Sequence, residues 1–171
     1  MTAAPLEPRP LAPAPSIPRR LAALPYEALL VLALSLIAAF PLAGFQNLAK
    51  AGLPHSLMQV YFFGVTALYF TWFWRRGGQT LAMKTWRFRV TTGTGAALSL
   101  RRALARYLLA LMFYGPACVG LLLMFFPDRV SPALSAWLFL PLIATILWAR
   151  FDADRQFLHD RMAGTRLSSV M

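Results

Sequence analysis

Few residues of this 171-residue chain could exchange protons or bind ions, and three of them stand apart by their surroundings. Arg20 and Glu27 lie seven positions apart around the start of a long apolar stretch, and Asp160 lies in a short charged segment near the other end. A carboxylate in apolar surroundings can hold a proton or a cation, and a nearby arginine can keep it charged. Arg20, Glu27 and Asp160 could do such chemistry if suitable partner side chains lie beside them.

Arg20 and Glu27 would share one face of a helix but lie about 10 Å apart along its axis. This separation is too long for a direct ion pair, so each side chain needs a partner from elsewhere. We expect Asp160 opposite Arg20, and Arg102 or Arg106 opposite Glu27. Two interpretations stay open: a charge cluster that fixes helix register and seals one end of the bundle, or a carboxylate site that responds to protons or cations.

Catalytic and metal chemistry are not expected. His159 precedes Asp160, but the only other histidine, His55, falls on the opposite side of the chain's predicted topology, so a metal site lacks ligands. The single cysteine, Cys118, lies in an apolar run and excludes an intrachain disulfide. The sequence offers no nucleophile with a neighbouring general base, such as Ser-His-Asp or Cys-His, on a single side of the membrane. We therefore expect no enzyme activity, no cofactor and no metal.

The composition indicates a membrane protein. Apolar residues make up 58% of the chain and charged residues 13%, against roughly 45–50% and about 25% in soluble domains. Four apolar segments, residues 26–45, 57–74, 107–126 and 133–149, approach the ~20 residues that a helix needs to cross a bilayer. We predict an all-α integral membrane protein with four transmembrane helices. The short segment 127–132 predicts a tight hairpin between the last two; the alternative is one long, broken third span.

The first 18 residues contain six prolines and no apolar core. Such a segment is typical of a disordered tail and not of a cleaved signal peptide. We therefore expect the transmembrane domain to comprise residues 19–171.

Positive charge concentrates between the second and third apolar segments. The basic loop, residues 75–106, contains no Asp or Glu, and its cations are Arg75, Arg76, Lys84, Arg87, Arg89, Arg101, Arg102 and Arg106. With the termini it holds all but two of the 17 Lys and Arg, the exceptions being Lys50 and Arg129. The positive-inside rule then predicts that both termini and the basic loop are cytoplasmic.

Within the basic loop, polar and mostly apolar residues alternate over 84–91, which predicts an interfacial strand or small hairpin. Ser99 is expected to cap a helix that begins at Leu100. Each cation near an anionic membrane contributes about 1 kcal/mol of attraction, so we expect anionic phospholipids as the loop's partner. Trp86 and Phe88 are interleaved with the cations, as in surfaces that bind single-stranded nucleic acid, but the topology already explains the charge, so we expect no nucleic-acid partner.

Three blocks together resemble the RDD family of small bacterial membrane proteins. They are "RRLAALPYEALL", then "GGQTLAMKTWRFRV" with "LSLRRALARYLL", and finally "DRQFLHDRMAGTRL". The resemblance implies that Arg20 is the family arginine and Asp160 its second aspartate, whereas Glu27 replaces the first aspartate. It also implies supporting roles for Gly78, Thr80, Gly164 and Thr165.

The sequence thus predicts a non-enzymatic, multi-pass protein of a bacterial inner membrane. Its expected role is that of an interaction or assembly component with a basic cytoplasmic face, whose partners are the bilayer, its anionic phospholipids, and a second copy or another membrane protein. The alternative is a small cation/proton antiporter or solute transporter that uses Glu27, as an oligomer. The resemblance implies transport only as a possibility.

Overall fold

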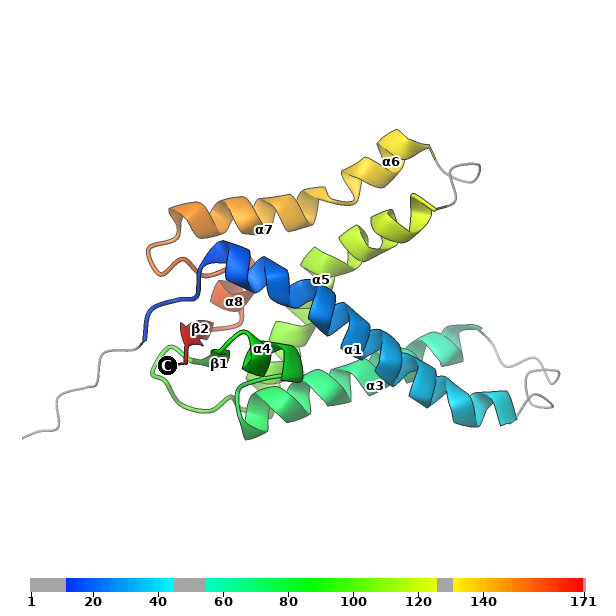
Figure 1. The fold of residues 1–171 in the computed structure, drawn as a ribbon, viewed down its shortest axis with the longest axis horizontal. Helices are drawn as coiled ribbons and strands as arrows, with labels where there is room; N and C mark the ends of the chain where they lie inside the picture. The colour runs from blue at the N-terminus through cyan, green and yellow to red at the C-terminus, as the bar shows by residue number, and fades with distance from the viewer. Residues whose placement is uncertain (1–11, 45–54, 126–130, 171) are drawn as a thin grey trace, which may run out of the picture.

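Four long helical segments form most of the computed structural model, which describes residues 12–44, 55–125 and 131–170 (Figure 1). They are α1 (Ile17–Gly44), α3 (His55–Arg76), α5 (Leu100–Leu123), and α6 (Pro132–Trp137) followed by α7 (Leu140–Phe151). Helix α5 is central, since it contacts α3, α6 and α7, while α1 packs on α3.

Three helical segments of the described chain are long and apolar enough to cross a membrane: Ile17–Leu42, Leu100–Leu123 and Pro132–Phe151. The predicted second span, residues 57–74, does form a helix, α3, but that helix is not among the three. Polar side chains such as Gln59, Thr66 and Thr71 dilute its apolar content. Three candidate spans are therefore supported by length and composition, and the fourth remains a prediction.

The ends of the predicted segments differ from the structure in two places. Helix α1 already begins at Ile17, and the carbonyl of Pro13 accepts a hydrogen bond from the amide of Ser169 at 2.9 Å. The fold therefore includes residues that we assigned to the N-terminal tail; residues 1–11 lie outside the described part. Residues 127–130, which make up most of the predicted hairpin turn, also lie outside it.

Four short elements form a cap at one end of the long helices. They are α4 (Leu81–Thr85), β1 (Phe88–Thr92), α8 (Leu158–Met162) and β2 (Thr165–Ser169). Strand β1 lies in the basic loop but pairs antiparallel with β2, with Val90 opposite Leu167, so the loop does not form a hairpin with itself. The cap therefore joins the basic loop to the C-terminal segment.

The turn before α4 depends on Gly78. Its φ is +69°, and its carbonyl accepts a hydrogen bond from the amide of Val90 at 2.7 Å. A Cβ atom at this position would lie 2.5 Å from the carbonyl oxygen of Val90, which no side chain can do without moving the backbone. Thr80 then caps α4 by accepting a hydrogen bond from the amide of Met83. These contacts explain two of the residues in the family-like loop motif.

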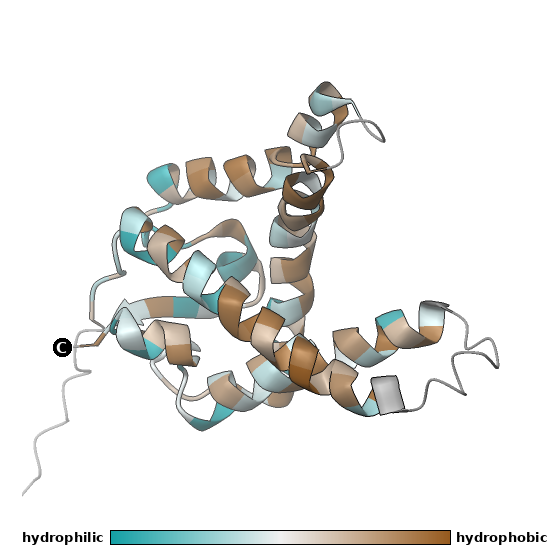
Figure 2. Cartoon of the chain, turned by 45° about the vertical axis from the view of Figure 1, so that its right-hand side comes forward, coloured by the Kyte–Doolittle hydropathy of each residue, from teal (hydrophilic) through white to brown (hydrophobic). Residues whose placement is uncertain are grey.

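The main buried core lies where the cap meets the long helices. It includes Trp74, Phe88, Val90, Tyr107 and Phe157. Farther from the cap, large apolar side chains of the long helices are exposed, as Leu36, Phe40 and Leu122 illustrate. Figure 2 shows this contrast, with hydrophobic residues along the long helices and hydrophilic ones gathered in and around the cap. Such a distribution suits helices whose outer faces contact lipid.

Helix α5 begins as predicted and packs closely on α6. Ser99 caps α5, which begins at Leu100. At Gly120, a Cβ atom would lie 2.9 Å from the carbonyl oxygen of Ser135 in α6, so the absence of a side chain there lets the two helices approach.

Candidate functional site

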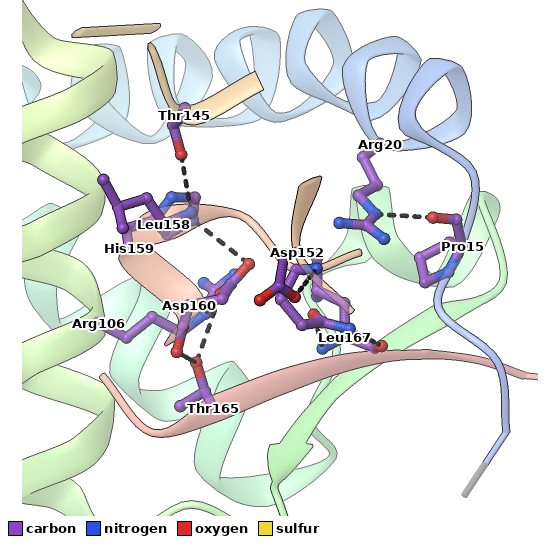
Figure 3. Close-up of polar contacts among 11 residues, drawn as sticks. Pro15, Arg20, Arg106, Thr145, Asp152, Leu158, His159, Asp160, Thr165 and Leu167 are labelled. Atoms are coloured by element: carbon purple, nitrogen blue, oxygen red, sulfur yellow. Dashed lines mark hydrogen bonds and ion pairs between the residues drawn. The ribbon is translucent and has the colours of Figure 1, made fainter. Parts of the chain in front are cut away.

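Asp160 lies at the centre of a buried charge cluster in the cap. Its side chain is inaccessible to solvent, and its Oδ1 accepts a hydrogen bond from Nε of Arg106 at 2.8 Å. The hydroxyl of Thr165 donates to the main-chain carbonyl of Asp160 at 3.2 Å. Figure 3 shows Arg106 on α5 and Asp160 on α8 pointing toward each other. This ion pair attaches the C-terminal segment to the central helix.

Arg20 approaches the same cluster from α1 but makes a different set of contacts. Its side chain is buried, Nε donates to the carbonyl of Pro15 at 2.8 Å, and the guanidinium lies over the ring of Phe157 at 4.9 Å. The predicted pair between Arg20 and Asp160 is therefore wrong, since Asp160 pairs with Arg106. The charge of Arg20 still acts on Asp160, because it helps to lower the pKa of that carboxyl.

His159 is the uncharged member of the cluster and packs against aromatic rings. Its ring stacks on Phe157 at 5.8 Å between ring centroids and meets Tyr114 edge-on at 5.2 Å. Burial lowers the pKa of His159 to about 4, although the charge of Asp160 opposes this change. The imidazole is therefore neutral near pH 7. Sequence reasoning considered His159 only as a metal ligand, and no group of metal-binding side chains occurs in the described ranges.

Asp160 itself remains charged. Burial alone would raise the pKa of its carboxyl, but the positive charges of Arg106 and Arg20, with the hydrogen bond from Arg106, outweigh burial and lower it. The carboxylate of Asp160 thus offsets the charges of two buried arginines, and Asp152 also acts on Arg20. The arrangement suits a fixed electrostatic link between helices α1, α5 and α8 better than a site that gains and loses a proton near pH 7.

Glu27 occupies a separate site on α1. Its Oε1 accepts a hydrogen bond from the hydroxyl of Tyr69 at 2.9 Å, and its Oε2 accepts one from the hydroxyl of Thr80 at 2.5 Å. The expected partners, Arg102 or Arg106, do not pair with it: Arg102 is exposed and Arg106 binds Asp160. That prediction is wrong. Thr80, which caps α4, also links it to α1.

The basic loop divides into one buried cation and seven exposed ones. Arg106 is buried, whereas the other seven side chains are exposed and make no ion pair with any described residue. The guanidinium of Arg76 lies over the ring of Trp72 at 4.0 Å. The exposed set is Arg75, Arg76, Lys84, Arg87, Arg89, Arg101 and Arg102.

The C-terminal segment has an ion-pair network of its own. Asp154 pairs with Arg161 at 2.8 Å and with Arg166 at 3.1 Å, and Asp152 lies 3.5 Å from Nε of Arg161. Gln156, which sequence reasoning did not single out, is buried and binds both main-chain groups of Leu167. It thereby holds β2 beside the cluster.

The turn before β2 contains the last two motif residues. Gly164 has a φ of +63°, a backbone conformation that glycine adopts without a Cβ penalty. Thr165 begins β2, and its hydroxyl reaches back to Asp160. Together they return the chain from α8 to the sheet.

Comparison with known proteins identifies one family. The model of the RDD family matches residues 14–164, a range that includes Arg20, Glu27 and Asp160. No curated protein matches the chain, and no solved structure does. The match confirms the resemblance drawn from the three sequence blocks.

Proposed function

The chain belongs to the RDD family of membrane proteins, and from that premise we propose that it is a non-enzymatic membrane component whose basic cytoplasmic face binds anionic phospholipid. The role is interaction or assembly in a bacterial inner membrane. The proposal includes four spans, cytoplasmic termini, and association with a second copy or another membrane protein.

One observation carries this proposal: the exposed cations of the basic loop have no acidic partner among the described residues, whereas the acids of that part of the chain are already bound to other groups. Asp160, Asp152 and Asp154 bind arginines, and Glu27 binds two hydroxyls. Seven exposed cations without an acidic partner would attract anionic headgroups by about 1 kcal/mol each.

The arrangement of the chain supports a single basic face. The start of α1, the end of α3, the basic loop and β2 all lie at the cap end (Figure 1). The pairing of β1 with β2 and the hydrogen bond between Ser169 and Pro13 hold these segments together. If the cap lies in the cytoplasm, the positive-inside rule is satisfied for the loop and both terminal segments at once.

The loop's attraction to lipid can be tested by hydrogen exchange. We expect the amides of residues 93–99 to exchange more slowly in bilayers that contain phosphatidylglycerol than in pure phosphatidylcholine. Replacing Arg101→Gln and Arg102→Gln together should remove about 2 kcal/mol of attraction, roughly thirty-fold in the docking equilibrium. The control Arg101→Lys with Arg102→Lys keeps the charge and should keep the slowing. Equal exchange of the wild type in both lipids would contradict the proposal.

A second candidate function, cation/proton transport, is favoured by the surroundings of Glu27. The carboxylate accepts hydrogen bonds from the hydroxyls of Tyr69 and Thr80, and it forms no ion pair with any described residue. Oxygen atoms are the ligands that hard cations prefer, and a carboxylate without an arginine partner is free to take up a proton. This candidate ranks second because transport paths in lipid usually contain further ionisable residues.

Inverted vesicles provide the test of this candidate. If Glu27 carries protons or cations, a cation gradient should drive proton movement in vesicles containing the wild type. Glu27→Gln should abolish the signal, and the control Glu27→Asp, which restores the family's carboxylate, should retain part of it. Absence of a signal from folded, inserted wild type would exclude this candidate and leave Glu27 as a structural acceptor.

A further inference from the structure

A groove of about 400 Å³ lies between the first turn of α1 and the last turns of α7. The two helix ends lie side by side next to the cap in both Figure 1 and Figure 2. They are also the ends at which two candidate spans meet the cap, so the groove opens at the boundary between the apolar helices and the polar surface. Its volume falls in the range of small-molecule sites, roughly 300–1,000 Å³.

The wall of the groove is almost wholly apolar. Ile17 and Pro18 form the side from α1, and Ile146, Leu147 and Phe151 form the side from α7. Leu147 is 55% exposed and Phe151 is 87% exposed. Apolar side chains this exposed at the end of a membrane span are suited to contact hydrocarbon chains.

Arg150 is the one charged residue in the lining. Its side chain is exposed, and it forms neither an ion pair nor a side-chain hydrogen bond with any described residue. The neighbouring cations of α1 are already used: Arg19 donates to the main-chain carbonyls of Trp86 and Arg87, and Arg20 is buried. A free guanidinium beside an apolar groove matches an occupant with an anionic head and a hydrocarbon chain.

We propose that this groove binds one anionic phospholipid, with an acyl chain along the apolar wall and the phosphate at Arg150. The inference rests on the proposed function in one respect, since both place the cap end at the anionic leaflet. It goes further, because it assigns a specific site for one lipid molecule, whereas the proposed function requires only a general attraction of the basic loop to anionic headgroups. Guanidinium groups bind phosphate oxygens through charge-assisted hydrogen bonds, which are stronger than neutral ones.

Native mass spectrometry of the full-length protein tests the site, with phosphatidylglycerol and phosphatidylcholine as the added lipids. We expect one phosphatidylglycerol to remain bound to the wild type in preference to phosphatidylcholine. Arg150→Gln should weaken its binding about five-fold. Leu147→Trp keeps Arg150 but fills the groove, and it should weaken binding of both lipids.

The control is Arg101→Gln with Arg102→Gln, which lowers the charge of the basic loop but leaves the groove intact and should still retain one lipid. Equal binding by wild type and Arg150→Gln, or by wild type and Leu147→Trp, would overturn the groove site. So would a wild type that retains no phosphatidylglycerol. A loop that docks on anionic bilayers while the groove variants bind like wild type would leave the proposed function standing and remove only this inference.

Discussion

Asp160→Asn is expected to lower the free energy of unfolding by about 3–5 kcal/mol, the cost of removing one partner from a buried ion pair. The substitution leaves the guanidinium of Arg106 buried without a counter-charge, and Arg20 loses the largest attraction that offsets its own burial. It also weakens the link between α5 and α8. Unfolding of purified protein in a mild detergent, followed by tryptophan fluorescence, would measure the loss.

A matched control is available in the same segment. Asp154 also pairs with two arginines, but its side chain is 36% exposed, and exposed pairs contribute only about 0–1 kcal/mol. Asp154→Asn should therefore change stability little. Equal losses from the two substitutions would show that burial of the Asp160 pair does not set its contribution.

A double-mutant cycle would separate the ion pair from its surroundings. Arg106→Met combined with Asp160→Asn removes both charges, so it should be less destabilised than the sum of the two single variants. Additive losses would mean that Arg106 and Asp160 act independently, against the 2.8 Å contact between them.

The long helices could be predicted because their signal is local. A run of about 20 apolar residues predicts a membrane helix without reference to the rest of the chain. Residues 26–45, 107–126 and 133–149 overlap three candidate spans for this reason. Segment 57–74 forms a helix of similar length, but its polar side chains make it less apolar than the three candidate spans. Length alone therefore does not identify a membrane span.

The cap could be predicted only in part. The alternation over residues 84–91 indicated extended chain, but β1 occupies Phe88–Thr92 and its partner is β2, at the far end of the sequence. Nothing local in either strand specifies such a distant partner. A small hairpin within the loop was therefore an equally reasonable prediction.

The candidate site shows the same division between residue identity and pairing. Arg20, Glu27 and Asp160 could be selected from charge type and family resemblance, but both predicted pairings, Arg20 with Asp160 and Glu27 with Arg102 or Arg106, were wrong. Pairing depends on how α8 and α4 dock against α5 and α1, which no spacing along the chain reveals. Tyr69 lies 42 positions from Glu27 in the chain, and only the packing of α3 on α1 brings its hydroxyl to that carboxylate.

Stability is expected to fall by roughly 3 kcal/mol as the pH drops from 6.5 to about 4, because of His159. Burial lowers the pKa of the folded imidazole to about 4, from about 6.5 when it is exposed. As the pH falls through this window, the unfolded chain binds a proton that the folded chain does not, so unfolding becomes easier. The contribution of His159 is fully present above pH 6.5. Asp160, with its lowered pKa, adds its own loss only below about pH 4.

Comparing the wild type with His159→Phe would show whether His159 causes the loss of stability over this pH range. The ring of phenylalanine can stack on Phe157 as the imidazole does, but it does not titrate. The charged or titratable groups that act on His159 are Asp160, Arg106 and Arg20, and the variant keeps all three. The wild type should lose about 1.4 kcal/mol per pH unit relative to the variant between pH 6 and 4.5. Parallel pH profiles would show that His159 takes up its proton equally in both states, which a neutral imidazole packed against Phe157 and Tyr114 does not permit.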